Sequence, residues 1–387
     1  MKKIIFIIFL SLLSSGCKKK TQERHFKMEI IEEISIKTND LISVNPGNTK
    51  FIETDSGTFL FAYNHVEKNY QFIDFSKGEV NHKIPLTFEG PNSVKGFLGA
   101  TLTGADSIWL TFSPPAIGLI NFKGELLLKR QVPNEMVSVT ALITTFYKPI
   151  IQIGAEIYGP QPYFMDHHEM GKELIAKHQL VFSYSFGTES TSWHEVFYSN
   201  TYWDNGKKLT DYSWDEREEK IYIAPYYDHQ IQVFDSATKR VVKRKEVKSV
   251  YVNRFNFVDN IPSGFEEANK NTLESEQYGP FIYDRFRDIF YRVFIPSYKS
   301  DNELSSEELR FIVRSRPYAG IMVLDNELNV LGEHLFDKFE IHTSTNMFVG
   351  EKGLYISLNN ENHPDYDENH FRYRVVRFNV GGDYENQ

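Results

Sequence analysis

Cysteine is nearly absent from this sequence. The 387 residues include one cysteine, Cys17, so the rest of the chain has no disulfide, no thiol nucleophile and no cysteine-bound metal. Basic residues are also in the minority, with 43 Lys and Arg against 52 Asp and Glu and a formal net charge of −9. Nucleic-acid binding needs a concentrated basic surface, so we expect no nucleic acid among the partners.

Signature motifs of common enzyme classes are also missing. The chain has no Gly-x-Ser-x-Gly elbow, no phosphate-binding loop and no Gly-x-Gly-x-x-Gly. These motifs are typical of serine hydrolases, nucleotide enzymes and dinucleotide enzymes. The sequence therefore names no reaction, and it leaves open whether the protein is an enzyme, with a non-catalytic role favoured and no cofactor expected.

No hydrophobic run is long enough to cross a bilayer as a helix. The apolar run from Ile4 to Leu13 follows Lys2 and Lys3 and has the length of a signal-peptide core, whereas a spanning helix needs about 20 residues. The segment Leu13-Ser14-Ser15-Gly16-Cys17 then resembles the lipobox of bacterial lipoproteins. We predict a lipoprotein signal peptide over 1–17 with Cys17 lipidated, which would anchor the protein in a membrane, followed by a polar tether over 18–25.

The body of the chain, 26–387, repeats one unit six times. Each unit has a short apolar strand, a loop, a second apolar strand that ends in Asp or Asn, a polar turn and a third strand. The second strands end at Phe72-Ile73-Asp74, Leu119-Ile120-Asn121, Phe164-Met165-Asp166, Val233-Phe234-Asp235, Val323-Leu324-Asp325 and Arg377-Phe378-Asn379.

A weaker strand precedes each unit, which makes four strands per repeat. In the third unit this strand is expected near Val137 to Phe146, and the hairpin turn is expected at His167 to Lys172. Four strands repeated radially are typical of an all-β, six-bladed β-propeller. The last unit lacks an outer strand, and Phe26 to Lys37 would supply it and close the ring. A pair of β-sandwiches is the alternative, but it does not explain this closure.

The long connections are all expected on one face of this propeller. They are roughly Ser183 to Leu209, Val250 to Gly279, Pro296 to Pro317 and Asn359 to His370. Helical periodicity is limited to Leu304 to Arg310, inside one of them. Long loops on a rigid scaffold are where binding usually occurs.

Aromatic side chains are concentrated in these loops. Flat apolar rings with a polar group suit a peptide, a glycan or a partner protein, although the same rings could simply pack the loops onto the blades. The candidate ligand-binding residues are Trp193, Tyr198, Tyr202, Trp203, Tyr226, Tyr227 and His229.

One loop contains both imidazoles and carboxylates. His363, Asp365, Asp367 and His370 fall within eight residues, and such a mixture suits Ca²⁺ through oxygen or Zn²⁺ through nitrogen. A hydrated loop is the favoured interpretation, with a metal site as the minor alternative.

Two segments resemble a known family. Phe88-Glu89-Gly90-Pro91-Asn92-Ser93-Val94 and Asp106-Ser107-Ile108-Trp109 are similar to the first two blades of an uncharacterised family of Bacteroidota lipoproteins, domain of unknown function 4221. The resemblance implies a cell-envelope location and the propeller architecture, and it transfers no catalytic residues. Surface-exported lipoproteins of that group carry acidic residues after the cysteine. Because Lys18 to Lys20 stand there, we expect an outer-membrane anchor that faces the periplasm.

These observations predict a lipid-anchored envelope protein that binds a peptide, glycan or partner protein through its long-loop face, without catalysis. The alternative is an envelope hydrolase or lyase that acts on glycan with Asp, Glu or His residues from the same face.

Overall fold

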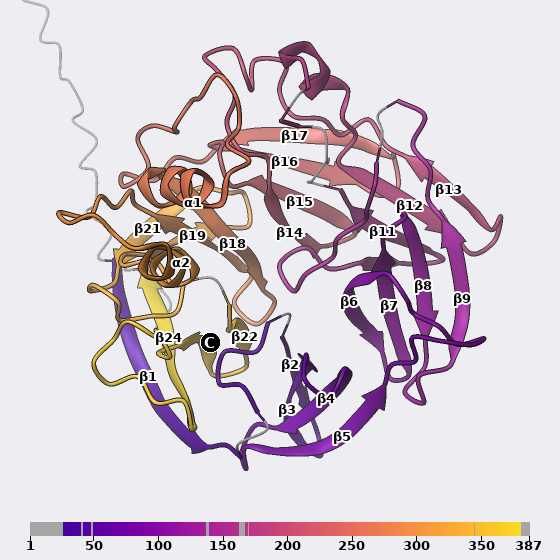
Figure 1. Cartoon of the computed structure of the whole chain (residues 1–387), viewed down its shortest axis with the longest axis horizontal. Coiled ribbons are helices and arrows are strands. Elements are labelled where there is room, and N and C mark those ends of the chain that lie inside the picture. Colours follow the sequence, from indigo (N-terminus) through magenta and orange to yellow (C-terminus); the bar gives the residue numbers. More distant parts are fainter. Residues whose placement is uncertain are drawn as a thin grey trace, which may run out of the picture.

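The chain forms six four-stranded antiparallel sheets arranged radially around one axis (Figure 1). The structure is a computed structural model, and it describes residues 26–380 except 40, 41, 48, 137, 138, 162–166, 169 and 344. Each sheet is one blade of a β-propeller. The six-bladed architecture predicted from the repeats is therefore confirmed, and the alternative of paired sandwiches is excluded.

The strands of each blade are consecutive in sequence except in the last. From the axis outwards they are β2 (Lys50–Thr54), β3 (Gly57–Asn64), β4 (Asn69–Asp74) and β5 (Glu79–Pro85) in blade 1; β6 (Phe97–Gly104), β7 (Ser107–Phe112), β8 (Ala116–Ile120) and β9 (Leu126–Gln131) in blade 2; and β10 (Ile151–Ile153), β11 (Glu156–Pro160), β12 (Val181–Ser185) and β13 (Ser190–Trp193) in blade 3. The second half comprises β14 (Tyr212–Arg217), β15 (Lys220–Pro225), β16 (Gln230–Asp235) and β17 (Arg240–Glu246) in blade 4; β18 (Gln277–Asp284), β19 (Ile289–Ile295), β20 (Gly320–Asp325) and β21 (Val330–Leu335) in blade 5; and β22 (Met347–Gly350), β23 (Gly353–Ser357), β24 (His370–Val380) and β1 (Phe26–Lys37) in blade 6.

The first strand of the chain completes the last blade, as predicted. β1 pairs with β24 in antiparallel register, from Phe26 opposite Val380 to Lys37 opposite His370. This pairing joins the two ends of the described chain and covers the edge of β24, which would otherwise be open to edge-to-edge association.

The Asp or Asn that recurs at the end of the third strand caps the hairpin behind it. The Asp74 Oδ1 accepts hydrogen bonds from the backbone nitrogens of Ser76 and Lys77 at 3.0 and 3.2 Å. Asn121, Asp235 and Asp325 cap their turns in the same way. The short side chain of Asp or Asn can accept hydrogen bonds from backbone nitrogens of the turn that have no partner strand. This explains why Asp or Asn recurs at this position.

Blade 3 departs from the predicted strand positions. The expected strand end at Phe164-Met165-Asp166 lies outside the described residues. The third strand of this blade is β12, and the expected inner strand near Val137 to Phe146 is wrong because β10 takes that place. The described part of the connection between β11 and β12 contains the 3-10 helix η1 (Lys172–Lys177), so the hairpin expected at His167 to Lys172 on the short-loop face is also wrong.

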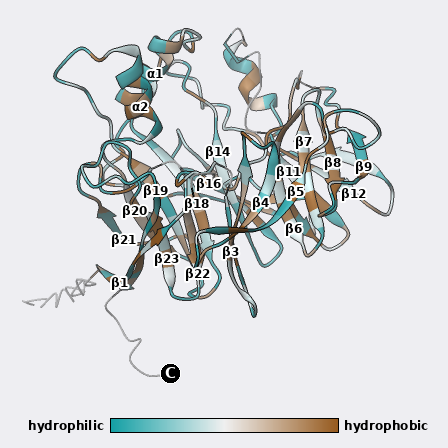
Figure 2. Cartoon of the chain, turned by 60° about the horizontal axis from the view of Figure 1, so that its bottom comes forward, coloured by the Kyte–Doolittle hydropathy of each residue, from teal (hydrophilic) through white to brown (hydrophobic). Residues whose placement is uncertain are grey.

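The long connections share one face, which we call the long-loop face (Figure 2). The predicted placement is confirmed for the segments that carry α1 (Phe265–Glu274) and α2 (Ser306–Arg314), and both helices stand on this face. The insertion expected at Ser183 to Leu209 is shorter, because β12 and β13 occupy its first part.

A buried arginine fixes α1 to the blades. Arg316 is 2% exposed, and its guanidinium donates to the carbonyl oxygens of Thr272 and Leu273 at the last turn of α1, at 2.7 and 2.6 Å. The same carbonyls also accept the backbone nitrogens of Ser275 and Tyr298 at 3.3 and 3.0 Å, and a cation at a helix C-terminus is favourable. Arg316 lies in the connection between α2 and β20, so this long connection holds α1 in place on the long-loop face.

Candidate functional site

A two-residue hairpin enters the central channel of the propeller. The backbones of Thr145 and Lys148 pair with each other at 3.1 and 3.2 Å, which places Phe146 and Tyr147 at the tip. The Tyr147 hydroxyl accepts a hydrogen bond from the backbone nitrogen of Met347 at 3.1 Å. Tyr147 precedes blade 3 and Met347 begins blade 6, so this side chain connects blades on opposite sides of the ring.

The hairpin divides the channel into two chambers, because Thr145, Phe146 and Tyr147 line both of them. The outer one, which we call the mouth chamber, has a volume of about 260 Å³. Its lining comes from residues that precede inner strands and from one loop of the long-loop face: Thr49, Thr145, Phe146, Tyr147, Lys148, Asp211, Tyr226, Thr345 and Asn346.

An ion pair stands in the wall of the mouth chamber. Lys148 Nζ lies 2.7 Å from Asp211 Oδ1, and the lysine side chain is 9% exposed whereas the aspartate is 36% exposed. Asp211 Oδ1 also accepts the backbone nitrogen of Tyr212 at 2.7 Å. Asp211 Oδ2 has no hydrogen-bond partner among the described residues, so the pair can still accept a hydrogen bond from a ligand.

Asn346 contributes a second unused acceptor to the same chamber. Its Oδ1 is buried and has no hydrogen-bond partner among the described residues, and the residue is 3% exposed. Its amide nitrogen donates to Thr345 Oγ1 at 3.2 Å, and its backbone has a φ of 60°. A buried carbonyl without a donor costs roughly 1–3 kcal/mol, so a hydroxyl or amine of a ligand would be favourable here.

The inner chamber is smaller and more apolar. It has a volume of about 180 Å³, and Lys50 and Asp215 are the charged residues of its described lining, beside Phe61, Trp214 and Phe281. Lys50 Nζ donates to the Leu102 carbonyl at 2.7 Å. Burial raises the pKa of Asp215 to about 6, although two backbone nitrogens donate to it.

The family model described as Domain of unknown function (DUF4221) matches residues 27–335. The chain belongs to the DUF4221 family. A crystal structure of a DUF4221 member from Bacteroides vulgatus is similar, with 20% identity and a TM-score of 0.78 over 92% of this chain and 99% of that one. A protein from Bacteroides fragilis, named as a candidate exported protein, matches with 10% identity and a TM-score of 0.51 over 91% and 95%.

These similarities establish the fold of this DUF4221 chain and carry no activity over to it. Among curated proteins, no sequence matches the chain. Within the residues that the structure describes, no helix is both long enough and apolar enough to span a membrane. Cys17 and the predicted signal peptide lie outside the described residues.

Four of the aromatic candidates are buried in the DUF4221 propeller rather than displayed on its surface. Their exposed fractions are 3% or less for Tyr198, Tyr202 and Trp203, and 5% for Tyr227. Tyr202 and Trp203 donate hydrogen bonds to the carbonyls of Leu209 and Lys208. In this structure Tyr198, Tyr202 and Trp203 pack the connection between blades 3 and 4 onto the core, and Tyr227 packs the connection between β15 and β16, which is the alternative that the sequence left open.

The other three candidates keep partial exposure. Tyr226 lines the mouth chamber. Trp193 ends β13 and donates through Nε1 to the Pro133 carbonyl at 2.7 Å. His229 lies on the loop after β15, with its Nδ1 2.7 Å from the Tyr278 hydroxyl, and burial lowers its pKa to about 4.

The loop with the predicted metal ligands forms two separate pairs. His370 Nδ1 lies 2.8 Å from Asp367 Oδ2, whereas His363 Nδ1 accepts the backbone nitrogen of Asp365 at 3.1 Å. In the described part of the chain, no group of three or more His, Cys, Asp or Glu side chains is placed to hold a metal ion.

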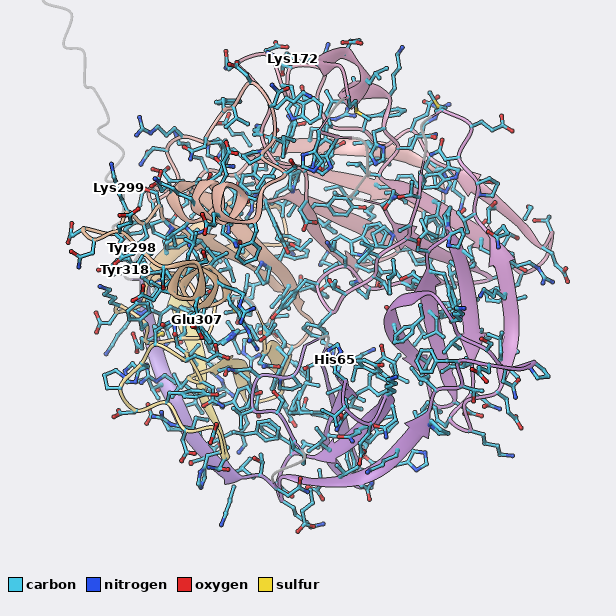
Figure 3. All side chains as sticks on the ribbon, in the orientation of Figure 1. His65, Lys172, Tyr298, Lys299, Glu307 and Tyr318 are labelled. Carbon is cyan, nitrogen blue, oxygen red and sulfur yellow. The ribbon has the colours of Figure 1, made fainter. Side chains whose placement is uncertain are left out.

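Two further histidines, His65 and His168, lie in other connections of the long-loop face. Figure 3 shows His65 beside the central opening, in the connection between β3 and β4. His168 belongs to the connection between β11 and β12, and its Nδ1 lies 2.8 Å from the Ile261 carbonyl oxygen. Neither histidine lines the mouth chamber.

Sequence analysis missed the polar residues of the mouth chamber. Thr49, Asp211 and Asn346 each stand one residue before an inner strand, β2, β14 and β22. Lys148 comes shortly before β10. Once the inner strands are known, the position directly before each inner strand is the signal that could have identified the polar residues of the mouth chamber.

Proposed function

We propose that this DUF4221 protein is a lipid-anchored component of the cell envelope that binds a glycan by one sugar unit in the mouth chamber. The observation that carries the proposal is Asn346, whose buried Oδ1 has no partner among the described residues and which lines a chamber that also contains the Lys148–Asp211 pair. A sugar unit carries several hydroxyls, each with one donor and two acceptor sites, so one hydroxyl can donate to the asparagine oxygen, a second can donate to the carboxylate, and either can accept from the ammonium.

The apolar part of the chamber supports the same ligand class. Phe146, Tyr147 and Tyr226 contribute aromatic surface beside the polar groups. Sugar rings present flat faces of C–H groups, which pack against aromatic rings. A volume of about 260 Å³ suits one sugar unit of a longer chain, with the rest of that chain outside on the long-loop face.

The topology supports an orientation for such an anchored protein. β1 begins at Phe26, opposite Val380, and ends at Lys37, opposite His370, where the long connection of blade 6 ends. Phe26 therefore lies at the short-loop face. The nine steps from Cys17 to Phe26 reach at most about 30 Å, so a lipid on Cys17 would hold the short-loop face near the membrane and direct the mouth chamber away from it.

The lining of the chamber favours binding over hydrolysis. Glycosidases use two carboxyl groups on either side of the scissile bond, and Asp211 is the one carboxylic acid among the described residues that line the mouth chamber. We therefore propose binding without turnover, and analysis of each bound glycan for cleavage products checks this part.

The test is a glycan-binding screen with the full-length protein in detergent, followed by calorimetry on the hits. Asn346→Gly removes the acceptor and keeps the left-handed backbone that this position requires. We expect about a tenfold loss of affinity, the value of one hydrogen bond of about 1.4 kcal/mol. Lys352→Met, at an exposed pair with Glu32, is the control and should bind normally.

Two results would overturn the proposal. One is binding that Asn346→Gly and Lys352→Met leave equally intact, which would place the ligand elsewhere. The other is a screen in which peptides bind in the mouth chamber and glycans do not, because the ligand class would then be wrong.

A further inference from the structure

Two opposite charges face the inner chamber from opposite sides of the ring. Lys50 starts the inner strand of blade 1, and its Nζ donates to the Leu102 carbonyl oxygen of blade 2. Asp215 belongs to the inner strand of blade 4, and its Oδ2 accepts the backbone nitrogen of Tyr283 in blade 5 at 2.7 Å. Blades 1 and 2 stand across the ring from blades 4 and 5 (Figure 1). The inner chamber therefore has a positive wall and a negative wall.

Neither charge has a counter-ion. Within the described residues no ion pair includes Lys50 or Asp215, so the ammonium and the carboxylate do not contact each other, and their hydrogen bonds are to uncharged backbone groups. Two N–H groups of Lys50 and one lone pair on each oxygen of Asp215 stay unused. Both side chains are half-buried and line the chamber, so a ligand inside it can reach them. A charge withdrawn from water without a partner is unfavourable.

The inner chamber lies at the short-loop end of the channel. Three of its lining residues, Leu102, Asp215 and Ile282, each stand two residues before the end of an inner strand, β6, β14 and β18. These strands end where short connections lead into the second strands of their blades. The hairpin with Phe146 and Tyr147 separates the inner chamber from the mouth chamber. A small ligand can thus approach from the short-loop face without passing the hairpin.

The two walls favour a ligand that carries both charges. An anion beside Lys50 would face the carboxylate of Asp215. A cation beside Asp215 would be repelled by Lys50 and by Arg285, which is close enough to lower the pKa of Lys50. An uncharged ligand would leave both charges without a counter-ion. A molecule with a carboxylate and an ammonium pairs with both walls, and hydrogen bonds between charged groups are the strong ones.

The rest of the lining limits the size and polarity of this ligand. Phe61, Trp214 and Phe281 contribute apolar surface, and the indole nitrogen of Trp214 already donates to the Pro149 carbonyl at 2.8 Å. The chamber volume of about 180 Å³ equals that of about six molecules of liquid water. A ligand of this size is close to alanine, and an apolar lining disfavours a charged side chain.

We propose that the inner chamber binds a small amino acid as a zwitterion, with its carboxylate against Lys50 and its ammonium against Asp215. The ligand supplies each wall with the counter-ion that the chain itself lacks there. No covalent bond forms or breaks. The inference is independent of the sugar site, because the hairpin separates the two chambers and Asn346 does not line the inner one.

The test is calorimetry with the full-length protein in detergent at pH 7.5, where Asp215 is ionised because its pKa is about 6. The probes are alanine and 4-aminobutyrate, whose charges are separated by one and three carbons, so the tighter of the two reports the spacing of the walls. Propionate and ethylamine each keep one charge of alanine, and both should bind at least about tenfold more weakly than the better amino acid. If neither amino acid binds more tightly than propionate and ethylamine at millimolar concentration, water serves the two charges and the proposal is wrong.

Two variants test the walls separately. Asp215→Asn should weaken the binding of the better amino acid about tenfold and strengthen that of propionate, because the ligand then meets no like charge. Lys50→Met keeps an unbranched side chain, and it should weaken the same amino acid and strengthen ethylamine. A variant that only disturbed the fold would weaken every probe.

The mouth-chamber variant Asn346→Gly is the control and should bind the amino acid normally. Loss of glycan binding in this variant with unchanged amino-acid binding keeps the outcomes of the two proposals apart. If Asp215→Asn and Lys50→Met both bind the amino acid as the wild type does, the ligand lies outside the inner chamber and the proposal is wrong.

Discussion

The Tyr147 hydroxyl lies 3.1 Å from the backbone nitrogen of Met347 and 3.4 Å from its carbonyl oxygen. One phenol therefore serves as acceptor and donor for the inner strand of blade 6, although it comes from the hairpin before blade 3. Burial raises the pKa of Tyr147 well above its usual value, so the phenol stays protonated and can donate at any physiological pH. The partition between the two chambers depends on this contact.

Tyr147→Phe should destabilise the propeller by about 1 kcal/mol, because two buried backbone groups lose their partner. Denaturant unfolding followed by tryptophan fluorescence measures the loss. Tyr251→Phe is the control, since Tyr251 is 37% exposed and its hydroxyl bonds to none of the described residues. Equal stability of the two variants would mean that water replaces the Tyr147 contact at no cost.

Closure of the ring predicts different effects for two isoleucines of β1. Ile34 packs against the core between blades 1 and 6, whereas Ile31 is 37% exposed at a register shift. Ile34→Ser should lower the free energy of unfolding by about 2 kcal/mol through lost apolar burial, and Ile31→Ser should leave it within about 0.5 kcal/mol. The same denaturant measurement checks both. Similar losses would contradict the register in which β1 closes blade 6.

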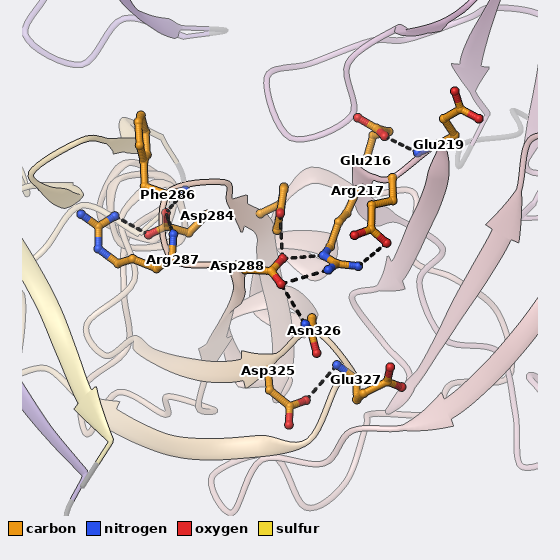
Figure 4. Close-up of polar contacts among 12 residues, drawn as sticks. Glu216, Arg217, Glu219, Asp284, Phe286, Arg287, Asp288, Asp325, Asn326 and Glu327 are labelled. Carbon is orange, nitrogen blue, oxygen red and sulfur yellow. Dashed lines mark hydrogen bonds and ion pairs between the residues drawn. The ribbon is translucent and has the colours of Figure 1, made fainter. Parts of the chain in front are cut away.

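An ion-pair network joins blades 4 and 5 on the short-loop face (Figure 4). Arg217 donates to both oxygens of Asp288 at 2.5 and 2.9 Å, and Asn326 donates to Asp288 Oδ2 at 2.8 Å. The hydrogen bond from Arg217 holds the pKa of Asp288 well below its usual value. The carboxylate therefore stabilises the fold above pH 4, and this contribution is lost as the pH falls through the lowered pKa.

Asp288→Asn should cost about 1 kcal/mol at pH 7, a value that allows for the 44% exposure of the aspartate side chain. The cost should shrink in unfolding measurements as the pH falls below about 4, because the unfolded carboxyl then binds a proton that the folded carboxylate, with its lowered pKa, does not. Glu218→Gln is the control, because Glu218 pairs with the same arginine but is 63% exposed, and it should have little effect. A cost for Asp288→Asn that does not change with pH would show that the charge contributes nothing.

The raised pKa of Asp215 predicts the opposite pH dependence of the unfolding free energy. Burial raises its pKa to about 6, so between pH 4 and 6 the folded state binds a proton that the unfolded state releases. The stability that comes from this protonated carboxyl is present below pH 4 and declines as the pH rises through 6. From pH 4 to pH 7, the unfolding free energy of Asp215→Asn should therefore rise by about 2 kcal/mol relative to that of the wild type. A constant difference would place the aspartate in contact with water.

The propeller was predictable because its signals are local. Each Asp or Asn that caps a hairpin occupies the same position in four blades, and the missing outer strand identified β1 as its replacement. The strands of blade 3 were misplaced for two reasons. β10 has only three residues, and the hairpin that follows β12, at Phe186, has no capping Asp or Asn. Helix α2 carries a Ser305–Glu308 capping box that marks its start, whereas α1 has no side-chain cap and was missed.

The candidate site was much less predictable than the fold. Lys148, Asp211 and Asn346 are far apart in sequence and meet only because inner strands converge on the axis. The aromatic residues in the connection between blades 3 and 4 gave a clear local signal, but local composition does not separate a ring that packs a loop from a ring that faces a ligand.

The predicted anchor can be tested by cell fractionation. Cys17 lies outside the described residues, and its lipidation is expected from the segment Leu13 to Cys17. Cys17→Ala removes the thiol that would receive the lipid, so we expect the protein to move from the membrane fraction to the fraction released without detergent. Ser15→Ala is the control, because a small residue remains there. Protease added to intact cells then tests the side of the membrane: α1 and α2, on the long-loop face, should be protected if the anchor faces the periplasm and cleaved if it faces outwards. Retention of Cys17→Ala in the membrane would show that another contact holds the protein there.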